Sequence, residues 1–162
     1  MQVWFVLLVG LTAIAAIVAL VWRPMRTAVR EAQFARARRE FHRQRERLEA
    51  KVFDLASSSG KPRGLRWLDT DFEDAVAYAR NRRNGDLAAF VGVTVSFEAV
   101  EGGLMEDVEA VSDLRVGTAV FRYQRGAWQT DGRILFNLNP TDAIAYYHDH
   151  FEMVGQELAH RH

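Results

Sequence analysis

The sequence predicts an α+β fold: an N-terminal transmembrane helix, a long basic helix, then an antiparallel four- or five-stranded meander covered by a C-terminal helix. Three observations predict it. Residues 3–22 carry no charged side chain, residues 27–56 contain neither glycine nor proline, and the residues after Gly64 alternate between apolar and polar. Helices that flank a run of strands, instead of separating the strands, are typical of an antiparallel α+β arrangement.

Residues 1–22 are expected to form a membrane anchor. At about 1.5 Å per residue the uncharged run extends roughly 30 Å, the hydrocarbon thickness of a bilayer. Trp4 and Trp22 lie near its two ends, and indole rings favour the headgroup region. Only Met1 and Gln2 precede the run, so the basic first region of a cleaved secretory signal is missing. We therefore interpret the run as a signal-anchor that makes the protein single-pass.

The charge next to the run predicts the orientation. Between Arg23 and Lys51 there are ten basic and four acidic residues, a net charge of +6, although the whole chain is neutral. Basic residues beside a membrane span stay on the cytoplasmic side, so the amino terminus is expected outside and the C-terminal domain in the cytoplasm. Arg23, Arg26 and Arg30 are nearest to the span, and we expect them to contact the anionic membrane surface.

Residues 23–56 are expected to form the basic juxtamembrane helix, with Pro24 at its start. Four apolar residues recur every seventh position: Phe34, Phe41, Leu48 and Leu55. They predict possible self-association as a coiled coil, but the second seam that a coiled coil needs is interrupted by arginines. The alternative is that the C-terminal half of the helix packs on the following domain. Nucleic acid is not an expected partner, because glutamates are interleaved with the arginines.

Residues 57–64 read as a linker, and residues 65–162 as the α+β domain. Asn84-Gly85 provides the positive φ angles of a tight hairpin turn between strands at 75–80 and 87–100. Shorter or further strands are expected at 65–69, 108–111, 114–123 and 128–138, with a turn at residues 124–126.

A final helix is expected to begin at Asn139-Pro140 and to cover the sheet. Its apolar stripe would consist of Ile144, Tyr147, Phe151, Val154 and Leu158. A helix followed by such a meander resembles, in architecture alone, the cystatin-like and nuclear-transport-factor-like folds. The resemblance implies a fold and carries over no functional residue, because fold does not imply function.

Two polar groups were considered as metal sites. Asp69, Asp71 and Glu73 would share one face of an extended segment, but the spacing is not that of an EF-hand. A solvated acidic turn between two short strands is the favoured interpretation. On the expected last helix His148 and Glu152 would lie one turn apart, which is too few ligands for a complete site. The common catalytic motifs are absent from the sequence. No catalytic, cofactor-binding or metal residue is therefore predicted.

These features predict a single-pass membrane-anchored protein that presents a small cytoplasmic α+β interaction domain. A non-enzymatic role is favoured, and an enzyme whose site is assembled from scattered residues such as Asp71, Tyr123, Asp131 and His148 stays open as a further alternative. The partners of the anchored protein would be the lipid bilayer and either a second copy or another protein. The alternative is a small-ligand or lipid-sensing domain held at the membrane, with a pocket lined by four aromatic residues. These are Phe90, Phe121, Trp128 and Phe136.

Overall fold

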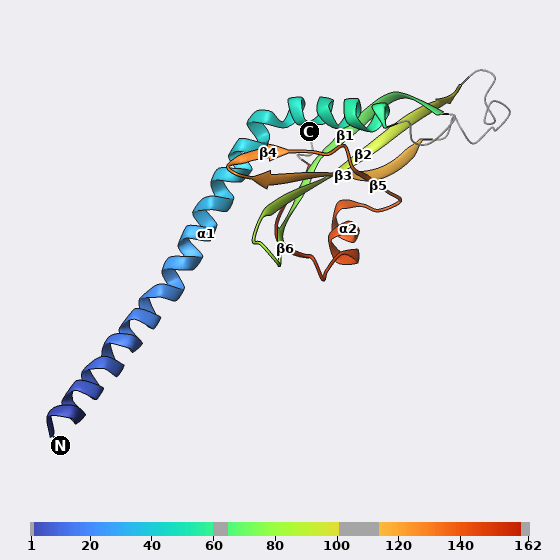
Figure 1. Ribbon diagram of the computed structural model, residues 1–162. Coiled ribbons are helices and arrows are strands. Elements are labelled where there is room, and N and C mark those ends of the chain that lie inside the picture. The colour runs from blue at the N-terminus through green and yellow to red at the C-terminus, as the bar shows by residue number, and fades with distance from the viewer. Residues whose placement is uncertain (1, 60–64, 101–113, 160–162) are drawn as a thin grey trace. The chain divides into compact units, whose positions relative to one another are not determined.

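The computed structural model describes residues 2–59, 65–100 and 114–159 (Figure 1). Within residues 2–23 most side chains are outside this description, that of Arg23 among them. The chain divides into two compact units, which are treated separately below. We call Met1–Arg39 the N-terminal unit and Glu40–His162 the sheet unit.

The first helix, α1 (Gln2–Ser58), is longer than expected because it does not restart at Pro24. The proline lies inside the helix, and the hydroxyl of Thr27 donates a hydrogen bond of 2.8 Å to its carbonyl oxygen. The helix expected over residues 23–56 is therefore present as part of a longer one. In the described part of the chain, no helix is long and apolar enough to cross a membrane. The anchor at 1–22 falls mainly on side chains outside the description, and it stays a prediction.

Over the described residues the sheet has six strands, whereas four or five were expected, and every pairing among them is antiparallel. The strands are β1 (Leu65–Asn81), β2 (Leu87–Ala99), β3 (Arg115–Gln124), β4 (Ala127–Gln129), β5 (Ile134–Phe136) and β6 (Phe151–Glu157). Their order is β4-β3-β2-β1-β6, and β5 also pairs with β3. The α+β class is confirmed, while the expected strand at 108–111 lies outside the described residues.

Both predicted hairpins turn where expected, but only one has the predicted backbone. Between β1 and β2 the connection spans residues 82–86, and of the Asn84-Gly85 pair only Gly85 has a positive φ, of 77°; its amide donates to the carbonyl of Asn81. The expectation of two positive φ angles there is therefore wrong. Between β3 and β4, Arg125 and Gly126 both have positive φ angles, of 53° and 81°. Two consecutive positive φ angles match the right-handed twist of the flanking strands, so the local sequence is enough to place this second turn.

β1 differs from the expectation of two short strands separated by an acidic turn. It is one strand of 17 residues, and its register against β2 shifts between Trp67 and Asp69 and again between Phe72 and Val76. The acidic residues are thus part of the sheet. Such bulges bend a strand without ending it.

The expected strand at 128–138 is divided into β4 and β5. Between them Gly132 has a φ of 75° and lies directly beneath α1, where an added Cβ would be 2.6 Å from Cβ of Leu55. The close approach of the helix and the left-handed backbone both interrupt the strand here.

The prediction of a long C-terminal helix is wrong. The helix α2 is only Pro140–Tyr146, with Asn139 as its N-cap, and the residues after the turn form β6. The apolar spacing of Phe151 and Val154 fits a helix, but Gly155 disfavours one, and β6 gains its backbone hydrogen bonds by pairing with β1. Pairing with a strand 70 residues earlier cannot be read from local periodicity.

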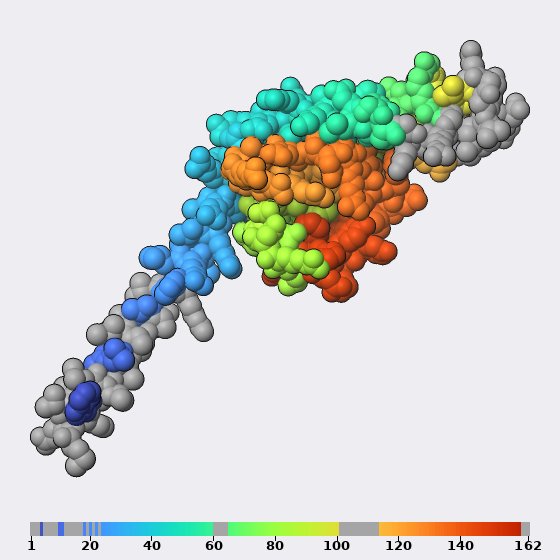
Figure 2. All heavy atoms as spheres, in the orientation of Figure 1, coloured from blue at the N-terminus to red at the C-terminus, as the bar shows by residue number. Residues whose placement is uncertain are grey.

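The two helices cover opposite faces of the sheet (Figure 1). On one face the α1 residue Phe41 contacts Phe121 and Trp128 edge to face, at ring centroid distances of 5.3 and 5.0 Å. On the other face Ala143 and Ile144 of α2 pack on a cluster of buried strand residues, namely Ala77, Ala79, Ala88, Phe90 and Val120. In Figure 2 the later part of α1 covers the residues around β4 and β5.

Candidate interaction surface

An arginine of α1 holds the second bulge of β1 in place. The guanidinium of Arg45 donates to the backbone carbonyls of Glu73 and Asp74, at 3.0 Å for the second, and also pairs with Glu49 at 2.6 Å. A bulge leaves backbone carbonyls without ladder partners, and the Arg45 side chain that reaches these two is only 16% exposed. Arg45 supplies a donor for both carbonyls, so its charge stabilises the sheet from within the helix interface.

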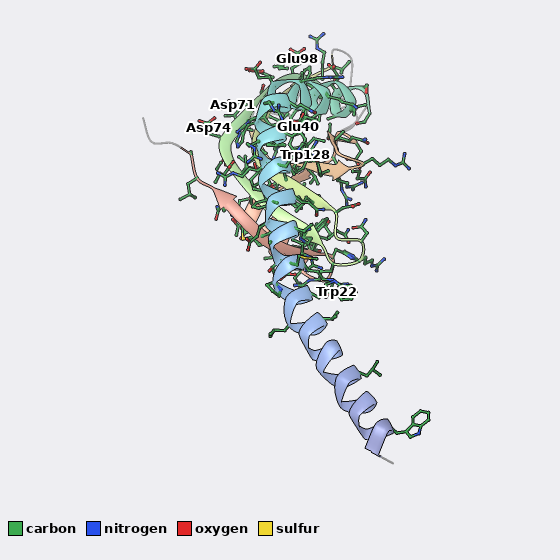
Figure 3. The ribbon with its side chains drawn as sticks, turned by 90° about the vertical axis from the view of Figure 1, so that its left-hand side faces the viewer. Trp22, Glu40, Asp71, Asp74, Glu98 and Trp128 are labelled. Atoms are coloured by element: carbon green, nitrogen blue, oxygen red, sulfur yellow. The ribbon has the colours of Figure 1, made fainter. Side chains whose placement is uncertain are left out.

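The bulged part of β1 presents a row of carboxylates on the face that carries α2. Asp69 is paired with Ser96 and Asp71 with Thr94, and paired residues share a face. Glu73 continues the row, because its carboxylate lies over Gly92, where a methyl group would overlap it. All three acidic residues are exposed, and Asp71 is labelled in Figure 3. The solvated acidic turn favoured from the sequence is therefore wrong in its backbone, because these residues lie in a strand and share one face of it.

Glu73 also borders a shallow pocket at the edge of α2. The pocket has a volume of about 230 Å³, and its polar lining comes from Glu73, Asn139, Thr141 and Gln156. It connects the acidic row to the start of α2.

Beyond this pocket α2 no longer covers the sheet. The neighbouring strand contributes the half-buried hydroxyls of Thr94 and Ser96, and β3 contributes Val116, which is 59% exposed and paired with Thr94. We call this surface the open face. It consists of Asp69, Asp71, Glu73, Thr94, Ser96 and Val116. Carboxylates, hydroxyls and an apolar margin together can bind a cationic, partly apolar group.

A second polar group ties the end of the sheet to α1. Tyr78, only 1% exposed, donates from its hydroxyl to Glu157 at 3.1 Å, and His42 lies 2.7 Å from the same carboxylate oxygen. These residues come from β1, β6 and α1. Phe41 packs against the ring of Tyr78 at a centroid distance of 6.1 Å. The sequence offered no sign of this group, because the three residues are far apart along the chain and belong to no motif.

The four residues predicted for self-association lie in different surroundings. Phe41 and Leu48 are buried against the chain's own sheet unit, Phe34 is half-buried and Leu55 is 37% exposed. Val52 and Ala56 complete the buried stripe. The buried residues of this stripe pack within the chain. This is the alternative stated above, in which the C-terminal half of the helix packs on the following domain.

Of the residues predicted to contact the membrane surface, Arg26 and Arg30 are exposed on α1, one turn apart. The side chain of Arg23 is outside the described residues.

Contrary to the expectation from the sequence, His148 and Glu152 do not lie one turn apart on a helix. His148 is in the turn after α2, where it lies 3.4 Å from Asp149, and Glu152 is in β6, paired with Arg82 at 3.7 Å. Among the side chains that the structure describes, no three potential ligands gather for a metal ion.

The four aromatic residues considered for a pocket lie on two faces. Phe90 is on the α2 face, where its ring contacts Phe151. Phe121 and Trp128 are on the α1 face, where both contact Phe41; Trp128 is labelled in Figure 3. Phe136 contacts Trp67 at the far end of the α1 face. They cannot line one cavity, because the sheet separates them.

Comparison of the chain with models of known protein families, with curated proteins and with solved structures gives no match.

Proposed function

We propose that this chain is a single-pass membrane-anchored protein whose sheet unit binds a protein partner in the cytoplasm. The observation that supports it is the open face, an exposed and chemically mixed surface on a sheet that is otherwise covered on both sides. Arg66 continues this face beside Asp69 but is paired with Glu98, and the three carboxylates of the open face form no ion pair that the structure records among its described side chains.

The chemistry of the open face favours a basic partner segment. Three carboxylates in one row attract arginine or lysine side chains, and the hydroxyls of Thr94 and Ser96 can accept or donate further hydrogen bonds. Val116 gives the margin an apolar contact. A basic peptide with one apolar residue beside its charges fits this arrangement.

The anchor and its orientation are part of the proposal. They are supported by the uncharged run at 3–22 and by the excess of arginine that follows it. The anchor would hold the sheet unit near the membrane.

A small-ligand or lipid-sensing domain is the alternative function. The pocket beside Glu73 is the surface that could bind a small cationic ligand. The aromatic residues do not support it, because they are divided between the two faces of the sheet.

Photo-crosslinking in cells tests the proposed partner surface. A photoreactive residue in place of Val116, on the open face, is expected to give a discrete adduct with a protein that carries a basic segment. The matched position is Leu55, which is exposed on α1 on the opposite side of the sheet. Asp69→Asn with Asp71→Asn should abolish the adduct, whereas Glu46→Gln with Asp54→Asn, equally exposed on α1, should preserve it. The same adduct from both positions would contradict the proposal.

Fractionation tests the anchor separately. The full chain should stay with membranes after an alkaline carbonate wash, and a chain that lacks residues 1–22 should be released. Protease added outside intact cells should leave the sheet unit uncut. Digestion of the sheet unit would reverse the proposed orientation.

A further inference from the structure

A groove runs along α1 in the N-terminal unit, immediately after the uncharged run. It has a volume of about 270 Å³ and is lined by Met25, Arg26, Val29 and Arg30. The two apolar residues are one turn apart, as are the two arginines, so the groove has an apolar side and a guanidinium side. All four side chains are exposed.

Trp22 connects this groove to the uncharged run. The guanidinium of Arg26 lies over its ring, 4.8 Å from the centroid, which is the geometry of a cation–π contact. Tryptophan favours the boundary between headgroups and hydrocarbon. The groove therefore begins where the proposed anchor would leave the bilayer.

The two arginines are available to a ligand. Among the described side chains neither Arg26 nor Arg30 forms an ion pair. Guanidinium groups bind phosphate oxygens in a two-pronged manner, and long arginine side chains can reach along the helix toward the membrane surface. The apolar side suits the glycerol and upper acyl part of a lipid.

We propose that this groove binds the headgroups of anionic phospholipids, with the phosphates at Arg26 and Arg30 and the upper acyl region against Met25 and Val29. The proposal rests on the proposed membrane anchor and adds the lipid class and the residues. Met25 is three residues beyond Trp22, about 5 Å of helix, so the groove lies within reach of the headgroup layer.

A second copy of the chain is a poorer occupant. Two such grooves packed together would place the arginines of both chains against one another, and like charges at short range repel. An anionic bilayer instead gains about fivefold in binding for each basic side chain near its surface.

The test uses the full chain in phospholipid vesicles. The sequence has no cysteine, so Gln33→Cys, one turn below the groove and exposed, gives a single site for a fluorophore. The vesicles contain phosphatidylcholine with 30% phosphatidylglycerol, and a trace of quencher is attached to the headgroup of one lipid or the other. We expect the quencher on phosphatidylglycerol to reduce the fluorescence of the labelled chain at least about fivefold more than the same quencher on phosphatidylcholine. We call this quotient the quenching ratio.

Two variants that each lose two arginines distinguish lipid binding in the groove from a general attraction between the basic helix and anionic lipid. Arg26→Gln with Arg30→Gln should bring the quenching ratio close to one. Arg39→Gln with Arg47→Gln removes the same charge from exposed positions that begin about 13 Å further along the helix, beyond the screening length, and should preserve the ratio.

Each outcome has one meaning. If the chain floats with the vesicles but its quenching ratio is near one, or if both variants lose the ratio equally, the lipid inference is overturned and the anchor is not. A chain that does not float with vesicles of either composition overturns the anchor itself.

Discussion

At the scale of single residues, Arg45 explains why a charged side chain lies on the stripe of α1 that faces the sheet. The sequence shows it only as an interruption of a heptad pattern. In the structure its guanidinium satisfies carbonyls that the bulge of β1 leaves without strand partners. A charge at an interface position can therefore mark a distorted strand opposite it, and periodicity alone cannot show that.

Replacing Arg45 should destabilise the sheet unit. Arg45→Met preserves the length of the side chain but leaves the carbonyls of Glu73 and Asp74 without their donor, which should lower the free energy of unfolding by about 1–3 kcal/mol. The control is Arg43→Met. Arg43 is paired with Glu40 but its side chain is 71% exposed, so its loss should cost less than about 1 kcal/mol. Urea unfolding followed by tryptophan fluorescence measures the free energy of unfolding of both variants. Equal losses would mean that the hydrogen bonds from Arg45 to the carbonyls of β1 contribute no more stability than an exposed ion pair.

Tyr78 offers a second test at this scale. Tyr78→Phe removes the hydroxyl that Glu157 accepts from, in a position that is almost fully buried. We expect a loss of about 1–2 kcal/mol of stability. Tyr146→Phe removes the same hydroxyl from a residue that is 70% exposed and should change nothing. A Tyr78→Phe protein as stable as the parent would mean that the contact with Glu157 contributes no net stability.

At the scale of elements, the sequence predicted what local residues determine. The turn at Gly85 and the alternation along β2 need only nearby residues, and both are present. The helix expected over the C-terminus failed because β6 is stabilised by β1, far away in the chain. The division between β4 and β5 was missed for the same reason, since it depends on the approach of α1 to Gly132.

The open face was half predictable. Alternation placed Asp69, Asp71 and Glu73 on one side of an extended segment, as the structure has them. Their exposure agrees with the favoured interpretation of a solvated acidic turn. The turn itself is wrong, because these residues are part of β1, and that depends on pairing with β2 across two register shifts, which local sequence does not show.

Gly132 should tolerate no side chain. Gly132→Ala would introduce a Cβ at 2.6 Å from Leu55 and also strain a φ of 75°. Gly85→Ala has a φ of 77° but open space around it, so it measures the backbone strain alone. Gly132→Ala should be the less stable of the two by about 1–3 kcal/mol in thermal or urea unfolding. Equal losses would show that α1 can move away from the loop without cost.

Phe41 should matter more than its partners in the heptad pattern. Phe41→Ala removes a fully buried ring that contacts Tyr78, Phe121 and Trp128, and should lower stability by about 3–5 kcal/mol. Leu55→Ala, at a partly exposed position, should cost much less. Unfolding that depends on protein concentration, with similar losses for both, would instead support a coiled coil between two chains.

At the scale of the whole molecule, the basic residues and the buried residues of α1 begin at different points along the helix. The basic residues begin at Arg23 and continue along α1 from the N-terminal unit into the sheet unit, and the first large buried side chain of the same helix is Phe41. The helix is thus uncharged over residues 3–22, rich in arginine after them, and one layer of the α+β fold at its end. The linker expected at residues 57–64 would place a domain boundary between the sheet and the end of α1, which is one of the layers that cover the sheet.

This arrangement predicts which fragments fold. A fragment of residues 40–162 retains Phe41, Leu48 and Val52 and should unfold cooperatively as a monomer, because it keeps every large buried side chain that α1 contributes to the core. A fragment of residues 65–162 exposes the face of the sheet that carries Phe121 and Trp128, and should aggregate or remain unfolded. Circular dichroism and sedimentation of the two fragments provide the measurement. A stable, monomeric 65–162 fragment would show that α1 only rests on a sheet that is already able to fold without it.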